Sequence, residues 1–260
     1  MSTTPSAPTT GTTAAAARAR DRVLAQARFE AATLLRNGEQ LLVALVLPVA
    51  VLVALVHTTG ISVGAGRRVD LVVPGVLALC VVSSAFTGQA ISVGFDRRYG
   101  VLRLLGVSPL GRTGLLAAKA VAVLAVIAIQ FVVIAGVGLA LGWEPSWSGI
   151  PAAALSTLLG TWAFVALALL LGGTLRAEGV LALANLVWLV LLGLGGVVVA
   201  GSELPDRFAP VVELLPSAAL GDSLRAALVD GTASPAHWVV LVVWGAVATL
   251  LARRLFRWSD

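Results

Sequence analysis

Residues 115–141 read LLAAKAVAVLAVIAIQFVVIAGVGLAL, and Lys119 is the only charged residue among them. A helix needs about 20 apolar residues to cross the hydrocarbon core of a bilayer, which is about 30 Å thick, because each residue advances it by about 1.5 Å. This stretch is longer than that and contains no proline. It is therefore predicted to form a transmembrane helix.

Five further segments are apolar and long enough to be predicted as spans: about 40–56, 71–95, 150–175, 180–200 and 237–252. The chain of 260 residues is 58% hydrophobic and 12% charged, whereas about a quarter of the residues in a soluble protein are charged. The alternating pattern of a membrane β-barrel is absent from the sequence. The predicted fold is therefore that of an all-α polytopic membrane protein, with six transmembrane helices in a domain of residues 39–260.

The Lys and Arg residues indicate the orientation of these spans. If both termini are cytoplasmic, fourteen of the 18 cationic residues lie on the cytoplasmic side, and only Arg67, Arg68, Arg207 and Arg225 lie outside. This distribution agrees with the positive-inside rule. The cationic residues are spread over short loops beside the spans, so the net charge of +5 reflects topology and does not indicate a nucleic-acid partner.

Two predicted regions precede the first span. Residues 1–17 are rich in Ser, Thr, Pro and Ala and are predicted to form a disordered cytoplasmic tail. Residues 18–38 gather apolar side chains on one helical face, which is typical of an amphipathic helix in the membrane interface. The alternative for this second region is a basic leader that only fixes the topology.

The longest predicted outer loop is 201–236, which contains four prolines and five acidic residues. A helix is predicted in it between Pro216 and Gly231, with Leu220 and Leu224 on one face. Such a helix either caps the outer mouth of a pathway or lies passively in the interface, and the sequence favours neither interpretation.

Motifs for chemistry are nearly absent. No GxxxxGK[ST] motif for binding ATP phosphates occurs. Residues 60–64 match the GxSxG pattern of a hydrolase, but they lie in a short loop and not in a strand–turn–helix. No group of His, Asp, Glu or Cys has the spacing of a metal site. Lys119 is the one charge within the spans and is expected to reach the nearby cytoplasmic interface with its long side chain, so an ion- or proton-coupled transporter would have almost no intramembrane charge to use.

Uncharged polar residues do occur within the spans. Thr87 and Gln89 lie in the second, Gln130 in the third and Asn185 in the fifth. Hydrogen bonds between helices are one explanation for such residues. The other is that these four side chains line a path for substrate.

Residues 95–109, FDRRYGVLRLLGVSP, connect the second and third spans. Gly100 and Gly106 divide the connector into short pieces, and Pro109 ends it. An apolar ridge of Val101, Leu102, Leu104 and Leu105 lies beside the arginines. A loop that only fixed topology would need the arginines but not the ridge, so the ridge predicts a docking site for a soluble partner.

This connector resembles that of the permease subunits of type-2 ATP-binding-cassette (ABC) exporters, a group that includes drug and antibiotic exporters of actinobacteria. The resemblance extends over the six spans and begins at about Arg18. Two positions depart from the family pattern: Arg98 stands where many relatives have an acid, and Val101 where many have Thr.

The resemblance implies a permease in the bacterial plasma membrane that works with cytoplasmic ATPase subunits and with a second permease copy or paralogue. ATP and Mg²⁺ would be bound by the ATPase, and this chain would hold no cofactor or metal and would not itself be an enzyme. The substrate would be a hydrophobic or amphipathic drug, antibiotic or lipid-like compound moved out of the cell. A coupling helix would contact the ATPase through Phe95, Asp96, Arg97, Arg98, Gly100, Leu102, Arg103, Leu105 and Pro109, and a second contact would involve Arg28, Glu30 and Arg36.

Two alternatives remain open at this point. The first is a non-transporting membrane scaffold or sensor that docks a cytoplasmic partner through residues 95–109. The second is a secondary transporter, which the scarcity of charges within the spans disfavours.

Overall fold

The computed structural model describes residues 18–36, 38–58, 66–102, 110–194 and 209–256, so the predicted tail 1–17 lies outside it. The described residues are almost entirely helical, and no strand occurs among them. In chain order the helices are α1 (Ala19–Arg36), α2 (Gly38–His57), α3 (Arg68–Val81), the π-helix η1 (Val82–Gly88), α4 (Gln89–Arg98), α6 (Gly111–Ala140), the 3-10 turn η2 (Trp147–Gly149), α7 (Ile150–Thr174), α8 (Ala177–Leu194), α9 (Ala209–Glu213), α10 (Pro216–Leu228) and α11 (Pro235–Leu255).

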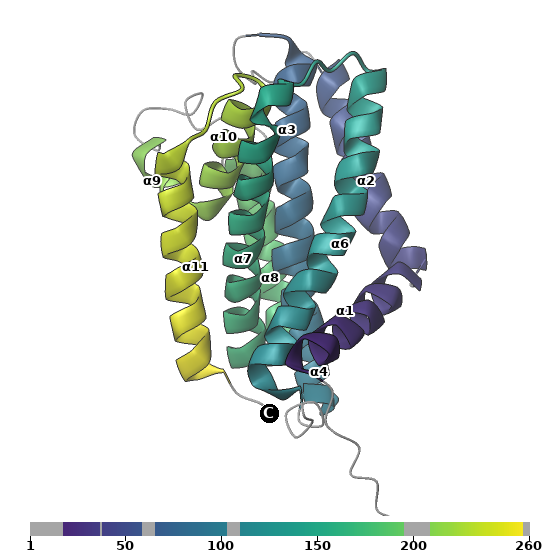
Figure 1. Cartoon of the computed structure of the whole chain (residues 1–260), viewed down its shortest axis with the longest axis vertical. Helices are drawn as coiled ribbons and strands as arrows, with labels where there is room; N and C mark the ends of the chain where they lie inside the picture. The colour runs from purple at the N-terminus through teal and green to yellow at the C-terminus, as the bar shows by residue number, and fades with distance from the viewer. Residues whose placement is uncertain (1–17, 37, 59–65, 103–109, 195–208, 257–260) are drawn as a thin grey trace, which may run out of the picture.

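The long helices form one bundle. Figure 1 shows α2, α3, α6, α7, α8 and α11 running along the long axis of the molecule, while α1 crosses obliquely near one end. The last residues of α4 and of α11 lie at that same end. We call it the connector end, because α4 ends and α6 begins there, and we call the other the far end.

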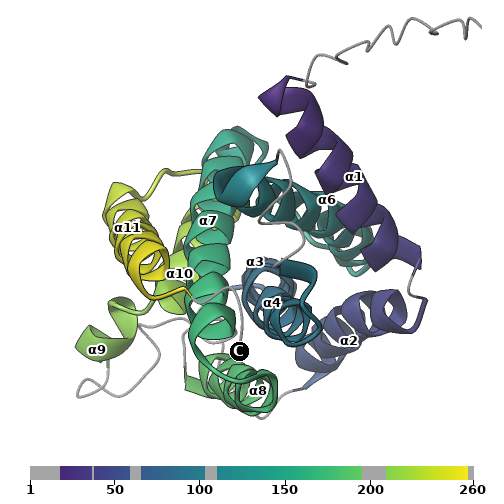
Figure 2. The same cartoon turned by 90° about the horizontal axis from the view of Figure 1, so that it is seen from below.

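A single helical rod forms the centre of the bundle. α3, η1 and α4 follow one another without a break from Arg68 to Arg98, and in Figure 2 the rod lies between α2, α6, α7 and α8. Val76, Ala85 and Val93 along it are all 0% exposed. The rod is therefore surrounded by protein over most of its length.

Four helices are long and apolar enough to cross a membrane: Arg68–Arg98, Ala117–Ala140, Trp147–Thr174 and Pro235–Leu255. They correspond to four of the six predicted spans. The apolar helices Ala44–His57 and Ala177–Gly193 are shorter. These two cover much of the predicted spans 40–56 and 180–200, and residues 195–200 lie outside the described ranges. Six spans thus remain a prediction, of which four are supported by helix length and composition.

The predicted amphipathic helix is present as α1, which packs against α6. Ala27 is buried at 4% exposure, whereas Phe29 and Leu24 are 68% and 39% exposed. One side of α1 is therefore covered by the bundle and the other is open.

The predicted helix after Pro216 is present as α10, and it lies within the bundle. It packs against α3, α7 and α11, and Leu220 and Leu224 are 0% exposed. Arg225 and Asp222 form an ion pair of 2.8 Å; burial lowers the pKa of Arg225, and the charge of Asp222 opposes that shift. This depth of burial argues against a passive interfacial helix.

Ion pairs connect two turns at the far end. Arg67 lies 2.7 Å from Glu144 and 3.5 Å from Asp70. The hydrogen bond with Glu144 raises the pKa of Arg67 above its ordinary value. The start of α3 is thereby attached to the turn between α6 and α7.

Candidate functional site

The central rod changes its helical geometry halfway along. In η1 the backbone forms a π-helix over the sequence VSSAFTG. A π-helix inserts an extra residue into the turn, and such insertions occur frequently at functional sites. Here the wider turn is rich in hydroxyl groups, with Ser83, Ser84 and Thr87, in an otherwise apolar span.

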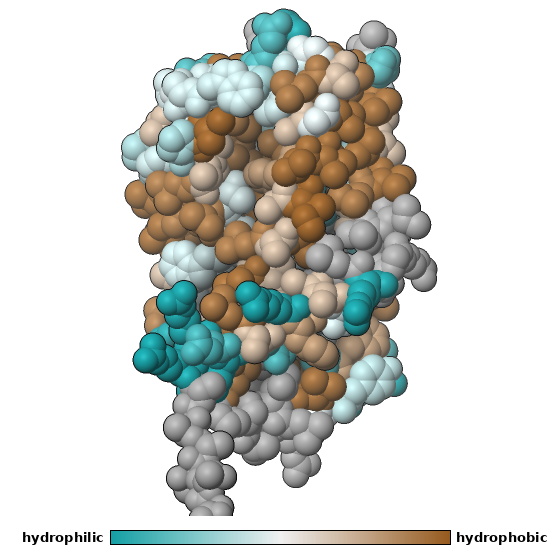
Figure 3. Space-filling model, turned by 45° about the vertical axis from the view of Figure 1, so that its right-hand side comes forward, coloured by the Kyte–Doolittle hydropathy of each residue, from teal (hydrophilic) through white to brown (hydrophobic). Residues whose placement is uncertain are grey.

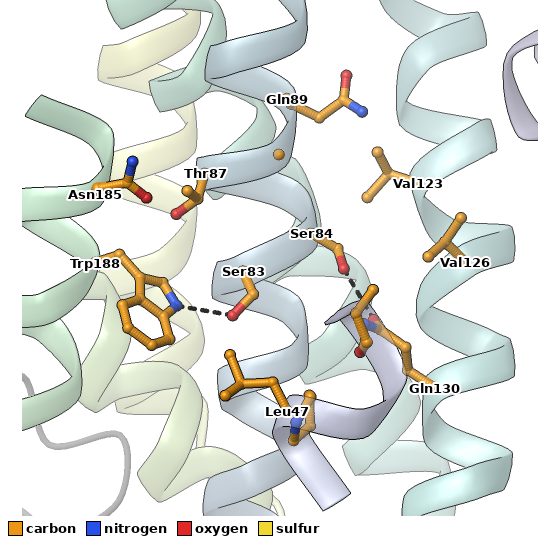
Figure 4. Close-up of a pocket in the computed structure, with 13 residues that line it drawn as sticks. Leu47, Ser83, Ser84, Thr87, Gln89, Val123, Val126, Gln130, Asn185 and Trp188 are labelled. Atoms are coloured by element: carbon orange, nitrogen blue, oxygen red, sulfur yellow. Dashed lines mark hydrogen bonds between the residues drawn. The ribbon is translucent and has the colours of Figure 1, made fainter. Parts of the chain in front are cut away.

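A cavity of about 290 Å³ lies beside η1. Its walls come from α2, the central rod, α6 and α8 (Figure 4). Its lining residues are Ala44, Leu47, Pro48, Ser83, Ser84, Thr87, Gly88, Gln89, Val123, Val126, Gln130, Asn185 and Trp188. We refer to it as the central pocket.

Hydrogen bonds tie the pocket walls together. Trp188 Nε1 donates to Ser83 Oγ over 2.8 Å, and Ser84 Oγ donates to Gln130 Oε1 over 2.9 Å. Gln130 Nε2 in turn donates to the carbonyl oxygen of Ala44 over 2.9 Å. These bonds link α8, η1, α6 and α2, and they account for four of the pocket side chains that carry polar atoms, Trp188, Ser83, Ser84 and Gln130, as structural contacts.

Two buried polar atoms of residues that line the pocket do not take part in these hydrogen bonds. Thr87 Oγ1 and Gln89 Oε1 are buried, and neither has a hydrogen-bond partner among the described residues. Leaving a buried polar atom unsatisfied costs about 1–3 kcal/mol, and such an atom therefore calls for an explanation. In Figure 4 Thr87 lies on the α8 side of the rod and Gln89 on the α6 side, so the two residues line the pocket from different sides.

All four residues predicted to line a substrate path, Thr87, Gln89, Gln130 and Asn185, line this one pocket. Gln130 is used for the contacts between helices, and Asn185 Nδ2 donates to the carbonyl oxygen of Leu181 on its own helix over 2.9 Å. The structure thus brings the four together, while a role in moving substrate remains a prediction.

At the connector end, α4 is attached to the turn between α7 and α8. Arg97 is 4% exposed and donates to the carbonyl oxygen of Leu175. Arg98 forms an ion pair with Glu178. Leu102, predicted to face the ATPase, is 1% exposed. Arg97 and Leu102 therefore contact the permease itself in this structure.

Other residues of the connector are open to the outside. Tyr99 is 71% exposed and stacks on Phe95 with ring centroids 6.1 Å apart. Val101 is 39% exposed. Between them Gly100 has φ +73°, a left-handed conformation that glycine adopts without strain. Arg103, Leu105 and Pro109, also predicted to contact the ATPase, lie outside the described residues.

Lys119 lies at the junction of three elements. Its side chain is 2% exposed, and its Nζ lies 2.9 Å from Asp96 on α4 and 3.1 Å from Glu30 on α1. Burial of a charge is costly unless it is paired. The lysine is paired twice, and this cluster joins α1, α4 and α6 directly before the connector.

The residues predicted for a second ATPase contact divide into two groups. Arg28 and Arg36 are exposed on α1. The carboxylate of Glu30 is directed inward to Lys119, so it contributes to the attachment of α1. A lone lysine in an apolar span is the one signal for this pairing in the sequence, and it does not identify the partners.

Comparison with known families gives one match. A family model described as "ABC-2 family transporter protein" matches residues 57–254, which is more than half of the chain. The matched range includes the central rod and the connector and ends in α11. No curated protein matches the sequence.

Proposed function

The chain belongs to the ABC-2 family of transporter proteins, and from this membership we propose that it is the permease of an exporter that moves a hydrophobic or amphipathic compound through the central pocket. As an ABC-2 permease it is a multi-pass membrane protein that works with ATPase subunits. We further propose that it spans the bacterial plasma membrane six times and pairs with a second permease.

The distribution of charge supports a cytoplasmic connector end. Arg20, Arg28 and Arg254 are exposed there, and Figure 3 shows hydrophilic residues gathered below a broad hydrophobic surface. Cationic residues favour the cytoplasmic side. An ATPase in the cytoplasm would therefore reach the connector and the exposed face of α1.

The observation that carries the proposal is the continuity between the pocket and the connector. Thr87 and Gln89 belong to the same helical rod that ends at Arg98. A push on the connector would be transmitted along this rod, because a helix is stiff along its axis. The π-helix, whose geometry differs from that of its neighbours, is the part of the rod best placed to change.

The composition of the pocket favours an amphipathic substrate. Leu47, Val123 and Val126 supply apolar walls, while the two unpartnered oxygens of Thr87 and Gln89 supply acceptor sites. Among the residues that the structure describes, no charged side chain lines the pocket. A compound with a large apolar part and one or two hydrogen-bond donors fits this surface.

Substitution of Thr87 and Gln89 tests the path. We expect Thr87→Val with Gln89→Leu to reduce resistance to a panel of amphipathic antibiotics about tenfold or more, in a strain that expresses the ATPase and lacks the native gene. Thr157→Val is the matched control, because its hydroxyl donates to Ala153 on the same helix. Unchanged resistance in the double variant, for a compound that the wild type exports, would contradict the path.

The exposed part of the connector is the place to test coupling. We expect Tyr99→Asp with Val101→Asp to abolish co-purification with the ATPase while membrane insertion persists, because a charge replaces an exposed apolar contact. Val211, which is 66% exposed on α9, provides the control Val211→Asp at the far end. ATPase binding at the wild-type level in the double variant would contradict the connector as the docking site.

A further inference from the structure

A second cavity lies on the other side of the molecule from the central pocket. It has a volume of about 530 Å³, within the range of about 300–1,000 Å³ typical of small-molecule sites. α7 lies between α6 and α11 (Figure 1), and all three helices line it. It shares no lining residue with the central pocket. The residues lining this lateral groove are Ala117, Ala120, Leu124, Leu158, Thr161, Trp162, Val165, Ala166, Leu169, Thr249, Ala252, Arg253 and Phe256.

The length of the groove matches one leaflet of a bilayer. On α7 it extends from Leu158 to Leu169, which is about 16 Å at 1.5 Å per residue. The hydrocarbon core is about 30 Å thick. The groove therefore covers about half of the core, on the side of the connector end, where α11 finishes.

The groove is open on the outer surface of the bundle. Leu158 and Trp162 among its lining residues are 52% and 39% exposed. In a membrane these side chains face lipid. An acyl chain can thus enter from the side, without passing through the central pocket.

A cation stands at one end of the groove. Arg253 is exposed in the last turn of α11, and no ion pair of this residue occurs in the part of the chain that the structure describes. Phe256 lies beside it and packs closely on α7, since a Cβ at Gly173 would come within 2.2 Å of its ring. An anionic group at the level of the membrane interface would meet the guanidinium, which binds phosphate well.

We propose that the lateral groove binds an anionic phospholipid of the leaflet at the connector end, with one acyl chain along α7 and the phosphate on Arg253. The lipid would connect α11 to α6 where the protein leaves a gap, and it would fill the space without entering the export path. The inference rests on the proposed function only for the orientation that makes this leaflet cytoplasmic.

The deep end of the groove distinguishes a lipid from a polar ligand. Thr161 is 1% exposed, and its hydroxyl has no hydrogen-bond partner among the described residues. It lies next to Trp162, whose ring packs against Gly245 of α11, eight residues before Arg253. An acyl chain offers no partner for this hydroxyl, whereas a polar exported compound would.

Fluorescence quenching tests the site. The purified full-length protein is placed in nanodiscs that contain phosphatidylglycerol or phosphatidylcholine with brominated acyl chains, and the part of the signal due to Trp162 is obtained by subtraction of Trp162→Phe. We expect several-fold stronger quenching by the anionic lipid. Arg253→Gln should remove this preference, and Arg254→Gln, which changes an adjacent exposed arginine outside the groove, should retain it.

A second pair of variants distinguishes the occupant. Thr161→Val replaces the hydroxyl by a methyl group of the same shape, and we expect it to keep or strengthen the lipid preference, as should the control Thr157→Val. A several-fold loss in Thr161→Val alone would overturn the proposal in favour of a ligand with a polar group at that depth. Equal quenching by both lipids, or equal loss in Arg253→Gln and Arg254→Gln, would also overturn it. These readouts need no transport, so they fail or succeed independently of the exporter proposal.

Discussion

At the scale of single residues, Lys119 is the most informative side chain. Its ammonium group lies between the carboxylates of Glu30 and Asp96 and is almost completely removed from solvent. Removal of one partner from a buried ion pair costs about 3–5 kcal/mol, because the remaining charge stays buried, whereas replacement of all partners by neutral groups is often tolerated. The cluster is therefore expected to be sensitive to single substitutions and tolerant of a complete one.

We predict that Lys119→Met lowers the unfolding temperature by several degrees. Cys80 is the only cysteine in the chain and is 0% exposed, so reaction with a thiol-specific fluorophore during heating reports the loss of structure. Lys119→Met combined with Glu30→Gln and Asp96→Asn should recover most of the stability. If the single and the triple variants unfold at the same temperature, the pairing does not govern the attachment of α1.

At the scale of elements, a change in the π-helix η1 is expected to affect transport and leave the fold intact. It places one extra residue between α3 and α4, so removal of a residue there should convert the turn to α-helix and leave both flanks in register. Ala85 is a buried residue of η1 without a polar group. It is therefore a suitable position for this change.

Deletion of Ala85 is predicted to leave a folded protein in the membrane, with Cys80 still protected, while export falls at least tenfold because Thr87, which belongs to η1, is displaced. Deletion of Ala78 in the regular part of α3 is the control. It rotates everything after it by about 100° and should unfold the bundle. Normal export without Ala85 would show that the π-helix has no part in transport.

The same scale shows what the sequence can and cannot predict. Hydrophobic length places α6 and α7 within a few residues, because the thickness of the bilayer sets both ends of a span. The helix after Pro216 is also predictable, since proline favours the first turn. Its burial against α3 and α7 is not, because packing depends on residues far apart in the chain. The π-helix η1 is not predictable either, because its Ser83, Ser84 and Thr87 indicate a polar patch and not a change of helical geometry.

At the scale of the whole molecule, the arrangement rests on the orientation in the membrane. Fourteen of the 18 cationic residues are assigned to the side of the connector end. The assignment depends on the positive-inside rule and on six spans, of which two are described only as shorter apolar helices. The side of each end can be measured directly.

Cysteine labelling in intact cells tests this orientation. In a Cys80→Ala background, we predict that a membrane-impermeant maleimide labels Ser148→Cys at the far end and labels Arg254→Cys only after the cells are opened. Both positions are exposed, so accessibility does not separate them. Labelling of Arg254→Cys in intact cells would reverse the orientation and place the connector outside, which would contradict a cytoplasmic ATPase.

The site could be predicted in part at this scale. The four polar residues Thr87, Gln89, Gln130 and Asn185 are identifiable from their position within apolar spans, and the fold brings them to one pocket. The partners of Lys119 could not be predicted from the sequence, because Glu30 lies 89 positions away and Asp96 lies 23 positions away. The burial of Arg97 and Leu102 was missed because topology and docking require the same residue types.

The cluster around Lys119 also bears on how the protein is made. Glu30 and Asp96 both precede Lys119 in the chain, so a ribosome produces the two carboxylates before the lysine. A lysine at the centre of a transmembrane helix opposes membrane insertion by about 2.5–3.5 kcal/mol, and Lys119, near the start of the span Ala117–Ala140, opposes it by less. When α6 emerges, its cation can be neutralised by residues that are already in place, and the third span can then enter the bilayer without carrying a bare charge. The two carboxylates thus reach the membrane before the cation that they neutralise.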